Sequence, residues 1–177
     1  MKRVLAIFLL GALVGCASND TSGSRTRVGS QDFFVANNAF LDENVGVLID
    51  QCIAFVEDGT RPNTAAFHDK GYEVGTLLGA LRYTRSLGTR TIDRLNGRGV
   101  SMLFSEKFER CNVSLTSVGG GVQLLGDWVA GRIAQQGYRQ TPSDRPRRFV
   151  FTKGNRSLLL SGSSANGQSV VWLQKVS

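Results

Sequence analysis

The sequence contains one histidine, His68, and the carboxylate of Asp69 follows it directly. A Ser–His–Asp or Cys–His nucleophile requires a histidine that lies close to both of its partners. None of the many serines stands in the G-x-S-x-G turn that presents a nucleophilic hydroxyl. One histidine is also too few for the usual zinc sites, so we expect no catalytic set and no metal site, and we assign His68 to the surface or to a helix end.

Paired carboxylates are the other candidates for catalysis, because glycosidases place two of them on either side of a sugar bond. Three neighbouring pairs occur: Asp42/Glu43, Glu57/Asp58 and Glu106/Glu109. The first pair falls at a predicted helix start, where negative charge offsets the helix dipole. The second falls at a helix end and the third in a predicted turn. We therefore interpret all three as solvated surface.

The glycine run Gly119-Gly120-Gly121 lies between a predicted strand and a predicted helix, where backbone amides could bind an anion. It lacks the Lys-Ser or Lys-Thr of a phosphate loop and the glycine spacing of a dinucleotide fold. We interpret it as a flexible connection, and no cofactor is expected.

Basic residues dominate the C-terminal part of the chain. Between Arg132 and Ser177 there are eight basic residues and a single acid, Asp144. The candidate binding cluster consists of Arg139, Arg145, Arg147, Arg148, Lys153 and Arg156. Because the planar guanidinium group binds phosphate and carboxylate, the cluster could contact an acidic protein or an anionic glycan. Charges on an edge strand also prevent unwanted strand pairing, and that alternative stays open.

The N-terminus has the pattern of an export signal. Met1-Lys2-Arg3 is positive, an apolar run follows from Val4 to Val14, and the run is too short to span a bilayer. The tetrad Leu13-Val14-Gly15-Cys16 resembles the lipobox of bacterial prolipoproteins. This resemblance implies that residues 1–15 are a signal peptide and that Cys16 carries a diacylglycerol and an acylated (palmitate-type) amino terminus, a durable membrane anchor. Ala17 after the cysteine favours the outer membrane, with the domain facing the periplasm.

Two cysteines remain, Cys52 and Cys111. In an oxidising, exported compartment an even pair predicts a disulfide, and two separate buried thiols are the alternative. A closed loop of about 60 residues would stabilise the fold by roughly 4 kcal/mol. Redox catalysis is not indicated, because there is no C-x-x-C motif.

Composition suggests one ordinary domain after a linker. Residues 16–31 are rich in Ser, Thr and Gly and predict a flexible tether, and residues 32–177 suit a single globular domain. The chain is 41% hydrophobic and 20% charged, with a formal charge of +7. Arginine greatly outnumbers lysine, and a genomic base composition that favours arginine codons is one explanation of that charge. The exported location makes nucleic acid an unlikely partner and favours anionic envelope components.

Periodicity predicts the elements. Apolar spacing of three and four indicates helices over residues 39–58 and from after Gly121 to about residue 136, with a short helical turn near residues 63–71. Alternation indicates strands at 81–86, 99–105, 110–117, 148–152, 157–163 and 169–175. Residues 140–147 read as a loop.

The two halves are similar. Each has a helix, then Gly71-Tyr72 or Gly137-Tyr138, and then a strand carrying Tyr83-Thr84-Arg85 or Phe151-Thr152-Lys153. We predict an α+β fold in which two amphipathic helices pack on one face of an antiparallel sheet, with one disulfide. Two αβββ repeats are one interpretation of the similarity, and chance matches between short elements are the other.

Three functions are compatible with these patterns. We place first a non-enzymatic envelope module that binds a protein partner or an anionic envelope polymer. A structural or assembly tether comes second, and a hydrolase acting on wall material comes last because no acid, base or nucleophile set converges. We therefore expect no enzyme.

Overall fold

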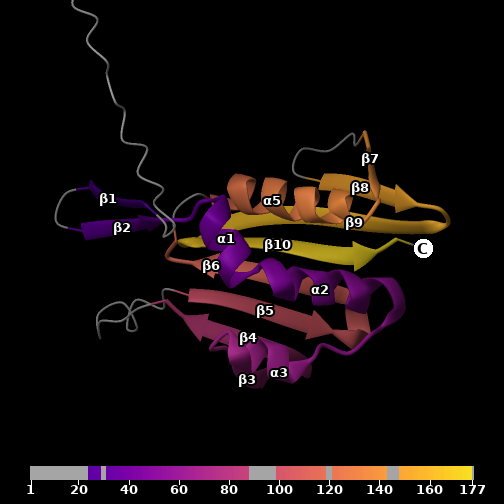
Figure 1. Cartoon of the computed structure of the whole chain (residues 1–177), viewed down its shortest axis with the longest axis horizontal. Helices are drawn as coiled ribbons and strands as arrows, with labels where there is room; N and C mark the ends of the chain where they lie inside the picture. Colours follow the sequence, from indigo (N-terminus) through magenta and orange to yellow (C-terminus); the bar gives the residue numbers. More distant parts are fainter. Residues whose placement is uncertain (1–23, 29–30, 88–98, 119–120, 143–147, 177) are drawn as a thin grey trace, which may run out of the picture.

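The computed structural model describes residues 24–28, 31–87, 99–118, 121–142 and 148–176. Among them, eight strands form one antiparallel sheet with helices on one side (Figure 1). In spatial order the strands are β3 (Glu73–Leu77), β4 (Ala80–Ser86), β5 (Gly99–Ser105), β6 (Arg110–Thr116), β10 (Gln168–Lys175), β9 (Arg156–Ala165), β8 (Arg148–Lys153) and β7 (Arg139–Thr141). The described helices are α1 (Asn38–Asn44), α2 (Gly46–Asp58), α3 (Thr64–Asp69) and α5 (Gly121–Gln135), with a 3-10 turn, η1, at Glu106–Phe108. The predicted α+β fold is confirmed.

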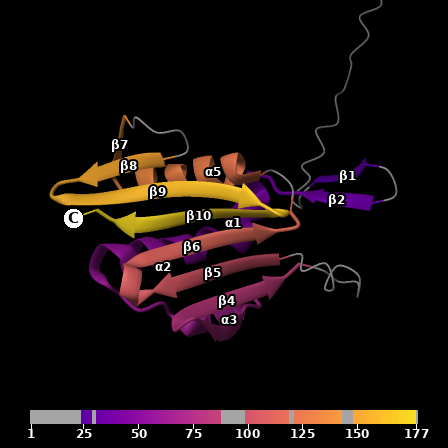
Figure 2. The ribbon, with the colours of Figure 1, turned by 180° about the vertical axis from the view of Figure 1, so that it is seen from behind.

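Seen from behind, the strands lie in front of the helices and no described helix crosses them (Figure 2). A separate hairpin of β1 (Ser24–Val28) and β2 (Gln31–Val35) precedes α1 and overlaps the segment 16–31 that the sequence predicts to be a tether. Among the described residues, no helix has the length and apolar character that a membrane crossing requires.

The sheet consists of two meanders, β3–β6 and β7–β10, joined where β6 pairs with β10. Each half contributes four strands, so the expectation of three strands per repeat is wrong. The added strands are the sheet edges. β3 is exposed along its whole length, and β7 has only three residues, so neither carries the burial alternation that reveals a strand. The start of the predicted loop 140–147 therefore belongs to β7.

The Gly-Tyr steps occupy equivalent places in the two halves. Gly71 and Gly137 both have positive φ, at 75° and 87°, and a Cβ on each would lie 3.8 Å from Arg85 and Lys153, respectively. The tyrosines that follow are both buried. Because Arg85 and Lys153 are also the matched positions of the two sequence repeats, the similarity between the halves extends to local geometry.

The predicted helix 39–58 is divided in two at Val45. Asn37 caps α1 by accepting from the Phe40 amide at 2.8 Å. At the end of α1, the Asn44 carbonyl accepts from the Tyr72 hydroxyl at 2.8 Å, and the Leu48 amide bonds to Val45 instead. The hydrogen bond from Tyr72 thus occupies the Asn44 carbonyl, which would accept from the Leu48 amide in a continuous helix.

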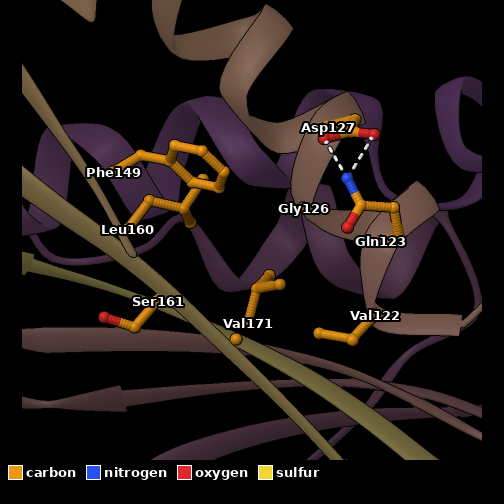
Figure 3. Close-up of a pocket in the computed structure, with 9 residues that line it drawn as sticks. Val122, Gln123, Gly126, Asp127, Phe149, Leu160, Ser161 and Val171 are labelled. Carbon is orange, nitrogen blue, oxygen red and sulfur yellow. Dashed lines mark hydrogen bonds between the residues drawn. The ribbon is translucent and has the colours of Figure 1, made fainter. Parts of the chain in front are cut away.

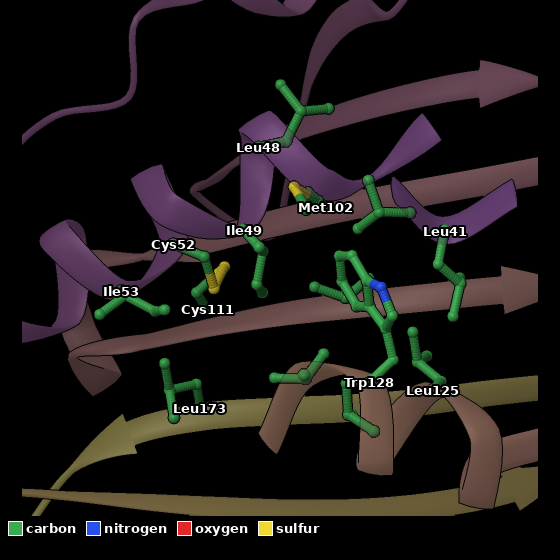
Figure 4. Close-up of a cluster of buried hydrophobic side chains, with 14 of the residues drawn as sticks. Leu41, Leu48, Ile49, Cys52, Ile53, Met102, Cys111, Leu125, Trp128 and Leu173 are labelled. Atoms are coloured by element: carbon green, nitrogen blue, oxygen red, sulfur yellow. A yellow bond between two sulfur atoms is a disulfide. The ribbon is translucent and has the colours of Figure 1, made fainter. Parts of the chain in front are cut away.

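The core lies between the helices and the sheet (Figure 4). The predicted disulfide Cys52–Cys111 is confirmed; it joins α2 to β6 across a Cα–Cα distance of 5.6 Å. Polar contacts tie helix α5 to the other helices. Trp128 Nε1 donates to Asp42 at 3.0 Å, and Arg132 pairs with Asp50 at 2.8 Å. One face of the sheet is therefore sealed by a cross-linked helical layer.

Candidate binding face

The predicted basic cluster is divided by the structure. Cys16, Arg145 and Arg147, like Gly119 and Gly120, lie outside the described residues. Lys153 and Arg156 are on the helix-covered side. Lys153 Nζ donates to the Gln136 carbonyl at 2.8 Å, and Arg156 pairs with Glu57 at 3.3 Å. These two residues hold the β8–β9 hairpin against the helices and do not belong to a free anion-binding patch.

Arg139 and Arg148 occupy the opposite side of the sheet. Arg139 is opposite Thr152, and Arg148 is opposite Ser161, in register positions that alternate with the buried Phe151 and Leu160. The four described members of the cluster therefore do not form one surface. Alternation along the strands separates residues that are close in sequence.

Five of the six paired carboxylates are exposed, as the interpretation as solvated surface expected, and Glu57 is the exception. Asp42 accepts from Trp128, and the Glu57 side chain is only 12% exposed because Arg156 and the Tyr138 hydroxyl both contact it. Burial and the adjacent Glu57 raise the pKa of Tyr138 above its usual range. Glu57 is thus a structural link between α2 and the second half.

The pairs 57/58 and 106/109 line one hollow at the end of α2, together with Lys175. Thr60 donates to the Asp58 carboxylate and lowers its pKa, and Arg61 lies 3.5 Å from Glu106. Across the described parts of the chain, no group of three or more His, Cys, Asp and Glu side chains could hold a metal ion. His68 is exposed at the end of α3, as predicted.

The contact between α5 and the sheet leaves only a small space (Figure 3). It has about 20 Å³ of free volume, lined by Val122, Phe149, Leu160 and Val171 among others. That is about the volume needed for one water molecule. Gly162 lies so close to α5 that a Cβ there would be 2.6 Å from Val122 Cγ2. This space is a packing contact and not a ligand site.

The side of the eight-stranded sheet away from the helices, which we call the open face, has a different composition. Register places six residues in one line across strands β4, β5, β6, β10, β9 and β8: Arg82, Leu103, Asn112, Trp172, Ser161 and Arg148. With strands about 4.8 Å apart, this Arg82–Arg148 row is roughly 24 Å long. An aromatic side chain at its middle and an arginine at each end suit an extended ligand.

Charge on the open face is mainly positive. Its basic residues are Arg82, Arg110, Arg139 and Arg148, and Glu73 is the one acid among the described strand positions on this side. Most other positions are Ser, Thr, Asn or Gln. A face of this kind favours a polar, anionic ligand over an apolar partner.

A hollow of about 310 Å³ lies over β6, β10 and β9 on the open face. Its lining includes Arg110, Asn112, Ser163, Gln168, Val170 and Trp172, and we call it the Trp172 hollow. Two of these lining residues each carry a buried polar atom without a hydrogen-bond partner, Arg110 Nε and Asn112 Oδ1. Because buried polar atoms are nearly always paired, these two atoms mark the hollow as the strongest candidate site.

Sequence analysis missed this site. Along β6 the side chains alternate, so that Cys111, Val113 and Leu115 lie in the core while Arg110 and Asn112 lie on the other face. What the sequence could not supply is the β6–β10 pairing, which brings Trp172 opposite Asn112.

Comparison of the chain with protein-family models, with curated proteins and with solved structures found no match in any of the three. We therefore infer what this chain could bind from its own side chains.

Proposed function

We propose that this protein is a lipid-anchored lipoprotein of the cell envelope that binds an anionic envelope polymer through the open face of its sheet, without catalysing a reaction. The observation that carries the proposal is the Arg82–Arg148 row, which places positive charge at both ends of a polar surface. Guanidinium groups bind carboxylates and phosphates with two parallel hydrogen bonds.

The membrane address rests on the lipobox-like tetrad Leu13-Val14-Gly15-Cys16 and on Ala17. A lipid on Cys16 would hold the domain at the periplasmic side of the outer membrane, next to the wall polymer. The wall glycan, with the carboxylates of its muramic acid and stem peptides, is the polymer we assign to the open face.

Co-sedimentation of the detergent-solubilised full-length protein with purified wall sacculi tests the proposal. We expect Arg82→Glu/Arg148→Glu to weaken binding at least about tenfold, since each substitution replaces a charge-assisted attraction with a repulsion. Binding should also weaken at about 1 M salt, where screening acts over about 3 Å.

The matched control is Arg61→Glu/Lys175→Glu, which changes net charge by the same amount at exposed positions around the hollows beside α2. It should bind like the wild type. Equal loss in both variants, or no sedimentation of the wild type, would contradict the proposal. Binding to anionic phospholipid vesicles but not to sacculi would also contradict it, and would show that the face recognises membrane phosphate.

A further inference from the structure

Two residues that line the Trp172 hollow each carry a buried polar atom that the protein leaves without a partner. Arg110 Nε and Asn112 Oδ1 have no partner, although both atoms are buried. A buried polar atom without a partner destabilises a fold, whereas one that bonds to a ligand contributes to affinity. Arg132 Nε is also unpartnered, but it lies in the helical layer, where its guanidinium group pairs with Asp50.

Strand geometry directs these atoms to one place. Arg110 and Asn112 are two residues apart on β6, so their side chains leave the same face. Trp172 of β10 is the direct register partner of Asn112, and it is half-buried. The Arg110 guanidinium is supported from the turn before β6, with its Cζ atom 5.2 Å from the centre of the exposed Phe108 ring. The donor, the acceptor and the indole therefore border one hollow.

The lining indicates the chemical class of ligand. An acyl chain would need a wholly apolar lining, whereas this lining combines the apolar Ala165 and Val170 with the polar Ser163 and Gln168 around Trp172. A sugar ring has a C–H face that an aromatic ring can cover, together with hydroxyl or acylamino groups that both donate and accept. The volume, about 310 Å³, is at the lower end of the range for small-ligand sites. A single sugar unit of a chain suits these dimensions.

Resting on the function proposed above, we propose that the Trp172 hollow is a saccharide subsite that takes one acidic N-acylated hexose unit of the polymer. The ring packs on Trp172, and the side chains of Asn112 and Arg110 turn toward it on binding, so that Asn112 Oδ1 accepts from an N–H or hydroxyl group of the sugar and Arg110 Nε donates to its acyl or carboxylate oxygen. The Arg82–Arg148 row then carries the neighbouring units of the polymer.

Tryptophan fluorescence of the full-length protein tests this subsite. The chain has two tryptophans, and Trp128 is buried in the core with 9% exposure, so a ligand on the open face reaches only Trp172. Titration with the wall disaccharide N-acetylglucosaminyl-N-acetylmuramic acid should give a saturable emission change. That change should be absent in Trp172→Phe and present in Trp128→Phe. Should Trp128→Phe fail to fold, the difference between the wild type and Trp172→Phe gives the same information.

Two substitutions separate recognition from folding. Measured by titration calorimetry, which does not need the Trp172 signal, Trp172→Ala and Asn112→Leu should each weaken disaccharide binding about tenfold or more. Asn112→Leu should also leave the urea midpoint unchanged or raise it, because it removes a buried acceptor without a partner. Ser101→Ala, on the same face but outside the hollow, is the matched control and should bind normally.

The outcomes distinguish this inference from the proposed function. If Arg82→Glu/Arg148→Glu abolishes sacculus binding while Trp172→Ala binds sacculi and disaccharide like the wild type, the subsite is wrong and the polymer-binding face stands. If the disaccharide alters Trp172 emission but sacculi do not sediment the protein, the proposed function fails. A titration with di-N-acetylchitobiose that matches the acidic disaccharide would overturn the acidic character of the subsite.

Discussion

The two faces of the sheet use the same strands for different purposes. On β6, Cys111 and Val113 are buried beneath α2, and Cys111 is cross-linked to it. Their neighbours Arg110 and Asn112 point to the other side and leave polar atoms without partners. Alternate residues of one strand thus belong to the core and to the proposed binding face. Substitutions one residue apart should therefore have different consequences.

The largest effect should come from the cross-link on the helix-covered face. Cys52→Ala/Cys111→Ala removes a link between residues 59 apart in sequence, and should lower the free energy of unfolding by roughly 4 kcal/mol. Urea denaturation measures this, and reduction of the wild type should reproduce it. At urea concentrations below its unfolding transition, the variant without the disulfide should still bind the saccharide. A loss below about 1 kcal/mol would mean that the helical layer does not depend on the cross-link.

Adjacent residues of β9 give a sharper comparison. Gly162→Ala places a methyl group against Val122 and should destabilise the domain by about 1–3 kcal/mol. Ser161→Ala, on the open face, should change stability by no more than about 0.5 kcal/mol. Adding Val122→Ala to Gly162→Ala should recover part of the loss, because the two positions are in contact. Equal effects at 161 and 162 would contradict the separation of the faces.

The smallest expected effect on stability comes from two tyrosines on the helix-covered side, and it appears only at alkaline pH. Burial raises the pKa values of Tyr72 and Tyr138 above the usual value of about 10. As pH rises above about 10, the unfolded chain releases these protons first, so stability is full below this pH and declines above it. Urea midpoints measured across this range should fall for the wild type. They should fall less steeply for Tyr72→Phe/Tyr138→Phe, and an unchanged slope would contradict this.

Much of the fold was predictable because its signals are local. The stripe through Leu125, Val129 and Ile133 identified α5, and alternation identified six of the strands and the face that carries Cys111. The edge strands β3 and β7 were missed because they bury little. The break at Val45 was missed because Tyr72, distant in sequence, takes the Asn44 carbonyl.

The candidate site was not predictable, and the reason is distance along the chain. Arg148, Lys153 and Arg156 are neighbours in sequence, but alternation and the β8–β9 hairpin place the last two against the helices. Asn112 and Trp172 are far apart in sequence and become neighbours only through the β6–β10 pairing. Short-range patterns identify charge and burial, whereas a binding face depends on strand order.

The position of the disulfide has a consequence for the order of events during synthesis. Both Cys52 and Cys111 precede α5, so a chain that emerges N-terminus first into an oxidising compartment can close the cross-link while the second meander has yet to emerge. The early half then waits with the β6 edge unpaired until β10 arrives. This pairing joins the most distant strands, and such contacts form slowly. The last step of maturation is therefore the docking of the second half onto a first half that is already covalently closed, and that same step creates the neighbours of Trp172.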